Sequence, residues 1–157
     1  MKTLLRISFL ALIAVVALAS FGSGAARAQV QPGKHPAFLH ALSDLRYARA
    51  NLEKRGGDPQ MKWDEATAIA AVDRAIADIK QAAIDDGKNL ADHPPVDPKD
   101  SRAGRLHKAL ATLEQSRKDI SEKEDNSFAA GLRDRAVADL DSAISFTKQG
   151  ISNAEHP

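Results

Sequence analysis

The sequence predicts an all-α protein, an up-down-up-down four-helix bundle formed by a duplicated helical hairpin. The first observation is an internal repeat, because a shift of the 157-residue chain by 68 residues aligns residues 41–45 with residues 109–113 without a gap. The same shift aligns further identical residues, which include Arg49 with Arg117, Asp73 with Asp141, Ile76 with Ile144 and Lys80 with Lys148. The second observation is that strand signals are missing after residue 28, where valine and aromatic residues are sparse. A repeat unit of two amphipathic helices therefore sets the predicted architecture.

The first repeat, residues 35–84, opens with a predicted helix over residues 36–54. Pro36 suits the first helical position, where its missing N–H would have no partner. Apolar residues recur at three- and four-residue steps and predict a buried stripe: Phe38, Ala41, Leu42, Leu45, Ala48 and Leu52. The turn at residues 55–59 ends this helix, and its Asp-Pro pair is a start signal for the next segment.

The second helix of this repeat is predicted over residues 62–84. Its apolar stripe consists of Ile69, Val72, Ile76, Ile79 and Ala83, with further alanines beside it. Gly87 is placed to take the left-handed conformation that commonly ends helices. Residues 85–100 contain three prolines, and proline cannot donate a hydrogen bond to a helix or a sheet, so this segment is the predicted linker.

The second repeat, residues 101–152, again predicts two helices, and residues 153–157 form a C-terminal tail. Asp100 or Ser101 is expected to cap the first of these helices, and Asn126 or Ser127 the second. The stripe of the third helix is Leu106, Ala109, Leu110, Leu113, Ser116 and Ile120. That of the fourth is Phe128, Leu132, Ala136, Val137, Leu140, Ala143, Ile144 and Ile151.

Short turns make the two helices of each hairpin antiparallel neighbours, and the linker is long enough to return the third helix alongside the second. This predicts an up-down-up-down bundle over residues 36–152, with pseudo-two-fold symmetry relating residues 35–84 to residues 103–152. A helical-repeat solenoid is the alternative, because 68 is twice the tetratricopeptide period of about 34 residues. The helices are too long for that repeat, and its Trp, Gly and Tyr signature positions are not filled.

Residues 1–28 have the layout of a secretory signal peptide. Two basic residues precede an apolar run over residues 7–21, and residues 26–28 read Ala-Arg-Ala, an A-x-A cleavage site. The run is shorter than the roughly 20 residues that span a bilayer, which favours cleavage over a membrane anchor. The mature chain is expected to begin at Gln29, with residues 29–35 as a short N-terminal segment, and to be periplasmic or secreted by a bacterium.

Charge and cysteine content exclude several function classes. Cleavage after residue 28 removes three of the 22 basic residues and none of the 21 acidic ones, which leaves a net charge of about −2. A near-neutral surface lacks the positive field that binds phosphate backbones, so no nucleic-acid partner is expected. The chain has no cysteine, which excludes disulfides, thiol catalysis and thiolate metal sites.

No catalytic residue is predicted, and the protein is expected to be neither an enzyme nor the carrier of a resident cofactor. No Ser, Thr or Lys has a recognisable activating neighbour. Specific metal motifs are also missing, namely Glu-x-x-His, His-Glu-x-x-His and the calcium-binding loop. His40 and His107, near the starts of the first and third helices, are expected at the edge of the core or on the surface.

One neighbourhood nevertheless combines carboxylates with imidazoles. In an up-and-down bundle, the linker and the start of the first helix share one end, which brings together five candidate metal ligands: Asp85, Asp86, Asp92, His93 and His35. Oxygen and imidazole donors without thiolates suit zinc, manganese or nickel better than copper(I). A solvated loop is the alternative, since Asp and Pro are what loops are commonly made of.

The arginine and aspartate positions retained by the repeat, such as Arg49 and Asp73, lie beside the apolar stripes. They are expected to pair across helices and to set the helix register; two symmetric clusters that bind a polar ligand are the alternative. Trp63 has no aromatic counterpart in the second repeat, where Gly131 is its equivalent. It is interpreted as a staple that packs the hairpin turn onto a helix end, with an exposed contact residue as the alternative.

Four segments, residues 35–42, 85–90, 92–97 and 104–110, resemble segments of small, exported, uncharacterised bacterial helical-bundle proteins. The resemblance covers nearly all of the mature chain, and it implies no activity. The chain is therefore expected to be an exported bundle that binds a protein or a small ligand without catalysis. A divalent-metal-binding protein that uses the Asp/His cluster of the linker is the alternative. A third reading is a bundle that opens its apolar stripes onto a membrane or an unfolded client.

Overall fold

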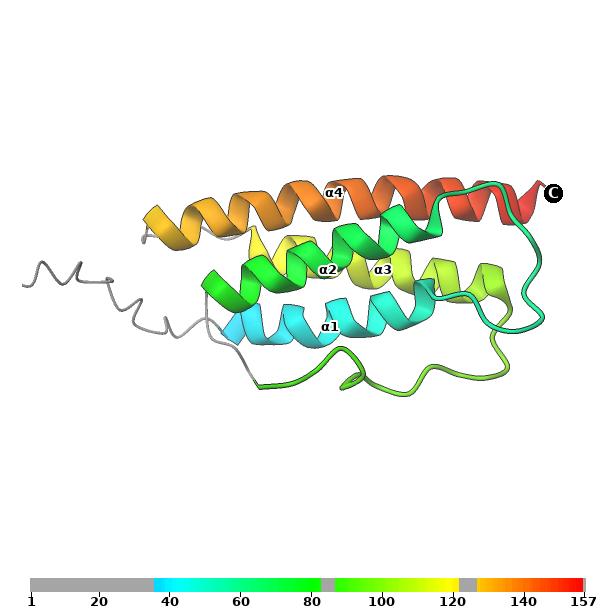
Figure 1. Ribbon diagram of the computed structural model, residues 1–157, viewed down its shortest axis with the longest axis horizontal. Coiled ribbons are helices and arrows are strands. Elements are labelled where there is room, and N and C mark those ends of the chain that lie inside the picture. The colour runs from blue at the N-terminus through cyan, green and yellow to red at the C-terminus, as the bar shows by residue number, and fades with distance from the viewer. Residues whose placement is uncertain (1–35, 83–86, 122–126, 157) are drawn as a thin grey trace, which may run out of the picture.

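The computed structural model describes residues 36–82, 87–121 and 127–156. These residues contain four α-helices (Figure 1). They are α1 (Pro36–Leu52), α2 (Glu65–Ala82), α3 (Arg102–Ile120) and α4 (Ser127–Glu155). No strand occurs among these residues, so the predicted all-α class is confirmed for them. None of the described helices combines the length and the apolar character needed to cross a membrane. The predicted signal peptide and the segment 29–35 lie outside the described residues.

Side-chain caps explain where two of the helices begin. Ser101 is the N-cap of α3, one of the two residues predicted for it, and its Oγ accepts a hydrogen bond from the N–H of Gly104 at 3.1 Å. The second helix begins later than predicted, at Glu65. Its start follows Asp64, whose carboxylate accepts a hydrogen bond from the N–H of Thr67 at 2.8 Å. Local capping therefore decides this boundary, which the apolar stripe alone leaves open.

The predicted stripes form the core between the helices. All six stripe residues of α1 are at most 3% exposed, and α2 buries Val72, Ile76 and Ile79 together with four alanines. Ile69 is only half-buried, so the buried face of α2 is turned toward its alanines. The prediction for Phe128 is wrong, since this residue is 48% exposed. It lies in the first turn of α4, which extends beyond the end of α2 (Figure 1).

The helices surround the core in the ring order α1, α2, α4, α3. The most extensive contacts join α2 to α4 and α1 to α3, and the contacts of α3 with α4 and of α1 with α2 complete the ring. α2 and α3 are therefore diagonally opposite. The third helix lies alongside the first and the fourth, whereas the sequence placed it alongside the second.

Helix directions also differ from the predicted alternation at one step. His40 near the start of α1 contacts Asp119 near the end of α3, while Arg102 at the start of α3 donates to the carbonyl of Glu53, just after α1. α1 and α3 are therefore antiparallel, as are α1 and α2 (Figure 1). It follows that α2 and α3 run in the same direction. The order along the chain is up-down-down-up.

The linker makes this topology possible because it runs back along the bundle. Its described part begins at Gly87, which has the predicted positive φ, 70°, and follows the outside of α1 as far as the start of α3 (Figure 1). Residues 87–101 reach roughly 50 Å when extended at about 3.3 Å per residue. The 17 residues of α1 span only about 26 Å at 1.5 Å per residue. The linker is therefore long enough for either route, which is why its length did not fix the direction of α3.

Positions related by the 68-residue shift occupy equivalent places in the two hairpins. Arg49 pairs with Asp73 between α1 and α2, and the equivalent Arg117 pairs with Asp141 between α3 and α4. The prediction that these charges pair across helices is confirmed. Burial repeats as well, in the pairs Ala41 and Ala109, Leu45 and Leu113, Leu52 and Ile120, Ala68 and Ala136, and Ala75 and Ala143.

Candidate functional site

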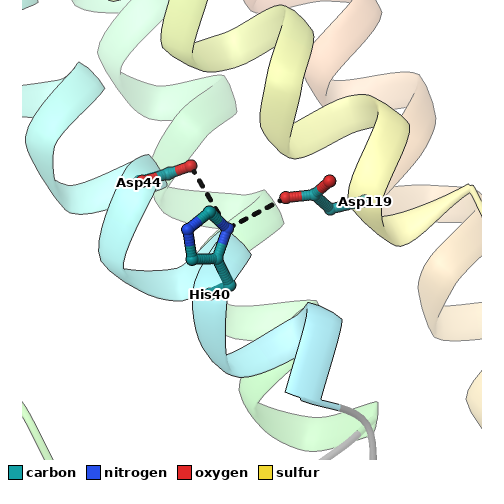
Figure 2. A group of neighbouring side chains, drawn as sticks. All are labelled: His40, Asp44 and Asp119. Carbon is teal, nitrogen blue, oxygen red and sulfur yellow. Dashed lines mark hydrogen bonds and ion pairs between the residues drawn. The ribbon is translucent and has the colours of Figure 1, made fainter.

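Three potential metal ligands converge where the first turns of α1 meet the last turn of α3 (Figure 2). His40 and Asp44 are one turn apart on α1, and Asp119 comes from α3. The Nδ1 atom of His40 lies 3.1 Å from Oδ2 of Asp119 and 3.6 Å from Oδ2 of Asp44. One ligand atom from each residue lies within 4.8 Å of the other two. Within the described part of the chain, this is the one group of His, Asp and Glu that meets such a geometry.

The two helices hold the ligands with different degrees of freedom. Asp119 is the most fixed, because its Oδ1 accepts a hydrogen bond from the amide of Gln115 at 2.7 Å and its side chain is only 18% exposed. Asp44 is 25% exposed, whereas the ring of His40 is 64% exposed. The carboxylates therefore form the inner wall of the site, and the imidazole closes it from the solvent side.

The electrostatics of the site favour a bound positive charge. The pKa of His40 is raised, first because its ring is hydrogen-bonded to Asp119 and then because Asp44 is close. The pKa of Asp44 is also raised, mainly by its burial and further by the charge of Asp119, whereas His40 acts in the opposite direction. The two carboxylates thus repel each other until a cation lies between them. That cation is either the proton on His40 or a metal ion in its place.

Two of the three separations between the donor atoms suit a small transition-metal ion. With bonds of about 2.0–2.1 Å, neighbouring ligands of a tetrahedral zinc ion are about 3.3–3.4 Å apart. The two separations from the His40 nitrogen, 3.1 and 3.6 Å, lie on either side of this value. One imidazole and two carboxylates are also the donor types that zinc, manganese and nickel accept. Three protein ligands leave at least one coordination position for water.

Two of the five ligands predicted from the sequence are described by the structure, and they lie apart from this group. Asp92 and His93 are on the linker, where Oδ2 of Asp92 accepts a hydrogen bond from the N–H of Asn89 at 2.7 Å. Nδ1 of His93 lies 2.7 Å from the carbonyl oxygen of Pro94, and the residue borders a small hollow beside Arg49 and Glu53 of α1. Asp92 and His93 therefore form hydrogen bonds within the linker itself. His35, Asp85 and Asp86 lie outside the described residues, so the full predicted set stays a prediction.

Part of the site was readable in the sequence. The side chain of His40 is mostly exposed, as expected, and its spacing of four residues from Asp44 places both on one helical face. Asp119 is 79 residues from His40, and only the antiparallel register of α1 and α3 brings the two together. A prediction that placed the third helix beside the second could not find this ligand.

His107 offers a useful contrast with His40. Its Nε2 lies 2.9 Å from Oε1 of Glu155, so it also bridges two helices, α3 and α4. Only this single carboxylate is paired with it, and no metal-like group of three forms around it in the described residues.

Comparisons with protein-family models, with curated protein sequences and with solved structures find no match to this chain.

Proposed function

We propose that the protein is an exported, non-catalytic binding protein whose ligand is a divalent transition-metal ion held by His40, Asp44 and Asp119. The observation that carries the proposal is the convergence of three donor atoms, from two helices, within 4.8 Å. The repulsion between the two carboxylates adds to it, because a cation between them relieves it. The proposal keeps the class of ligand that the sequence suggested for the linker and moves it to another part of the bundle.

Zinc is the preferred ion, with manganese and nickel next. Calcium prefers six to eight oxygen ligands, and magnesium near-ideal octahedral oxygen geometry, neither of which this site supplies. Only three protein ligands are available, and the imidazole is exposed to solvent. These features support a site from which the ion exchanges readily, as in a buffer or a carrier, in contrast to a closed structural zinc site.

Titration calorimetry tests the proposal on the mature chain, with zinc chloride as the titrant and calcium chloride as the negative control. Wild type should bind one zinc ion at this site, and His40→Ala and Asp119→Asn should each weaken binding at least tenfold. His107→Ala is the matched control, because it removes an exposed histidine that also bridges α3 to another helix. Zinc binding that is unchanged in His40→Ala would overturn the proposal.

The linker ligands form the second candidate, and the same experiment separates the two. His93→Ala leaves the His40 site intact, so a loss of binding in this variant alone would assign the ion to the linker set. Zinc at about 100 times its dissociation constant should also raise the free energy of unfolding by about 2.7 kcal/mol, since the ion binds the folded chain. A thermal melt with and without zinc measures that gain.

Export and duplication complete the proposal. The A-x-A site supports cleavage after Ala28, and intact-mass analysis of the exported protein should then give a chain that begins at Gln29. A membrane-bound chain that keeps Met1 would contradict export as a mature protein.

The repeated ion pairs and repeated burial support an origin from one helical hairpin that was duplicated.

A further inference from the structure

A pocket of about 560 Å³ lies at the end of the bundle where α1 ends, α3 begins and α4 ends, and His40 lies near the opposite end, at the start of α1. Its walls are the connection between α1 and α2, the start of α3 and the last turn of α4. This volume falls within the range of small-molecule sites, about 300–1,000 Å³. We propose that this pocket, called the Lys62 pocket below, binds a small organic anion, a carboxylate carried on an apolar body.

The charged side chains that line the Lys62 pocket are all basic. They are Lys62 and Arg102, which lie beside the imidazole of His156, and no Asp or Glu is found among the described residues of the lining. The chain after residue 28 has slightly more acidic than basic residues. A lining of one sign therefore departs from the average surface, and it selects against cations and for anions.

Arg102 lines the pocket with a side chain that is held in a fixed position. The residue is 5% exposed, and its guanidinium donates to the carbonyl of Glu53 at 2.9 Å and to the carboxylate of Glu65 at 3.0 Å. It also lies 5.3 Å from the centroid of the Trp63 ring. Burial lowers the pKa of Arg102, and the charge of Glu65 opposes this shift. Arginine stays protonated at neutral pH, so the guanidinium keeps a charge that Glu65 balances in part, and it is held in place before any ligand arrives.

The start of α3 adds hydrogen-bond donors to the same wall. The first N–H groups of a helix have no partner within the helix. Ser101 satisfies the N–H of Gly104, which leaves those of Arg102 and Ala103, two residues that line the pocket. Donors at a helix N-terminus favour a carboxylate or a phosphate. They reinforce the selection that the basic side chains already make.

The rest of the wall is apolar. Pro59, Met61, Ala103 and Ala154 contribute carbon atoms to the lining, and methionine adapts its shape to different apolar ligands. A second hollow of about 270 Å³ shares Met61 and Arg102 but includes Asp64 and Glu65, so it is not part of the proposed site. A ligand with an anionic head toward Arg102 and a short apolar body against Met61 satisfies both kinds of surface.

The fluorescence of Trp63 provides the assay, because Trp63 is the one tryptophan in the chain. Its ring also contacts the guanidinium of Arg102, a residue of the pocket lining. The mature protein is titrated with octanoate, and with octanamide as a neutral probe of the same size. Octanoate should change the emission of Trp63 in a saturable way, and octanamide should bind at least tenfold more weakly. Inorganic phosphate tests whether the charge alone is sufficient, and it should bind more weakly than octanoate.

Two variants place the binding in the pocket without touching the Arg102 network. Ala154→Leu fills the pocket, and Ala111→Leu is the matched control on the exposed face of α3. Octanoate binding should fall at least tenfold in Ala154→Leu and stay unchanged in Ala111→Leu, with similar melting temperatures for both. Lys62→Gln should weaken octanoate binding and leave octanamide binding as it is.

Three results would overturn the proposal: no saturable response to octanoate up to millimolar concentrations, equal binding of octanamide, or wild-type binding by Ala154→Leu. If Ala154→Leu does not fold, the Lys62→Gln comparison of octanoate with octanamide decides alone. His40→Ala should bind octanoate like the wild type, because the metal site lies at the other end of the bundle. The outcome is therefore independent of the metal proposal.

Discussion

The indole ring of Trp63 lies so close to Gly150 that a Cβ atom added to Gly150 would be 2.9 Å from Cδ2 of the ring. The ring packs against α4 at Gly150. It also makes a cation–π contact with the guanidinium of Arg102, from α3. The interpretation of Trp63 as a staple between the hairpin turn and a helix end is confirmed, and Gly150 is what makes room for it.

Gly150→Ala should therefore destabilise the fold, although alanine is the better helix former. The methyl group has to push the ring away, and overpacking of this kind costs about 1–3 kcal/mol. Urea denaturation followed by circular dichroism measures the change in the free energy of unfolding.

Gly131→Ala is the control for this substitution, since Gly131 lies on the same helix and a Cβ atom added to it would meet no atom of another part of the chain within 4 Å. This variant should gain about 0.5–1 kcal/mol from the higher helix propensity of alanine. Equal gains in both variants would show that Trp63 does not pack against α4 in solution.

The repeated ion pairs should differ in strength although their sequence spacing is the same. The side chains of Arg49 and Asp73 are 21% and 36% exposed, against 41% and 52% for Arg117 and Asp141. Double-mutant cycles to alanine should give about 0–1 kcal/mol of coupling for the more exposed pair and a larger coupling for Arg49 with Asp73. Coupling that is larger for the exposed pair would contradict this account.

Asp58→Asn should cost about 3 kcal/mol, because it leaves the buried guanidinium of Arg105 without its carboxylate partner. Burial by itself would raise the pKa of Asp58, but the N–H of Arg55 and the charge of Arg105 outweigh it and lower the pKa below its ordinary value. The stability that Asp58 contributes is therefore present above about pH 4 and lost as the pH falls through the lowered pKa. When the pH is lowered from 7 to 2, the free energy of unfolding should fall less in Asp58→Asn than in Asp134→Asn, a variant at an exposed site.

The charge of His40 should oppose metal binding and support the apo fold. Because its pKa is raised, the ion pair with Asp119 stabilises the apo fold fully below about pH 6.5, and this contribution is lost as the pH rises through the raised pKa. Titration of the imidazole by NMR should give a pKa above that of a free histidine, and Asp119→Asn should lower it. Glu155→Gln, at the far end of the bundle, should leave it unchanged. An unshifted His40 in the wild type would contradict the pairing seen in Figure 2.

Core substitutions test the stripe assignment. Leu45→Ala and Ile76→Ala remove side chains that are 0% and 3% exposed and should each cost about 2–5 kcal/mol. Leu39→Ala, at a position that is 43% exposed, should change stability much less. A melting temperature that Leu45→Ala leaves unaltered would mean that this face of α1 is not in the core.

Periodicity predicted the helices and most of the core, because the burial of residues such as Leu45 follows directly from their spacing. The direction of α3 was not predictable, since a linker of this length reaches both ends of the bundle. For the same reason the pairing of His40 with Asp119 was not predicted, because Asp119 reaches the site only through the register of α1 and α3. The burial of Arg102 was missed for another reason: its charge is satisfied by Glu65 and by the carbonyl of Glu53, and no local pattern encodes those partners.

The linker that runs the length of α1 also determines whether the chain folds on itself. Each hairpin presents the same kind of face to the other, so two separate chains could exchange hairpins and build the same contacts between molecules. A long linker disfavours this exchange, because it keeps the second hairpin at a high local concentration. Cut to about five residues, it would reach only about 17 Å, less than the length of α1, and α3 could no longer return beside α1 of its own chain. Such a variant should assemble as a domain-swapped dimer.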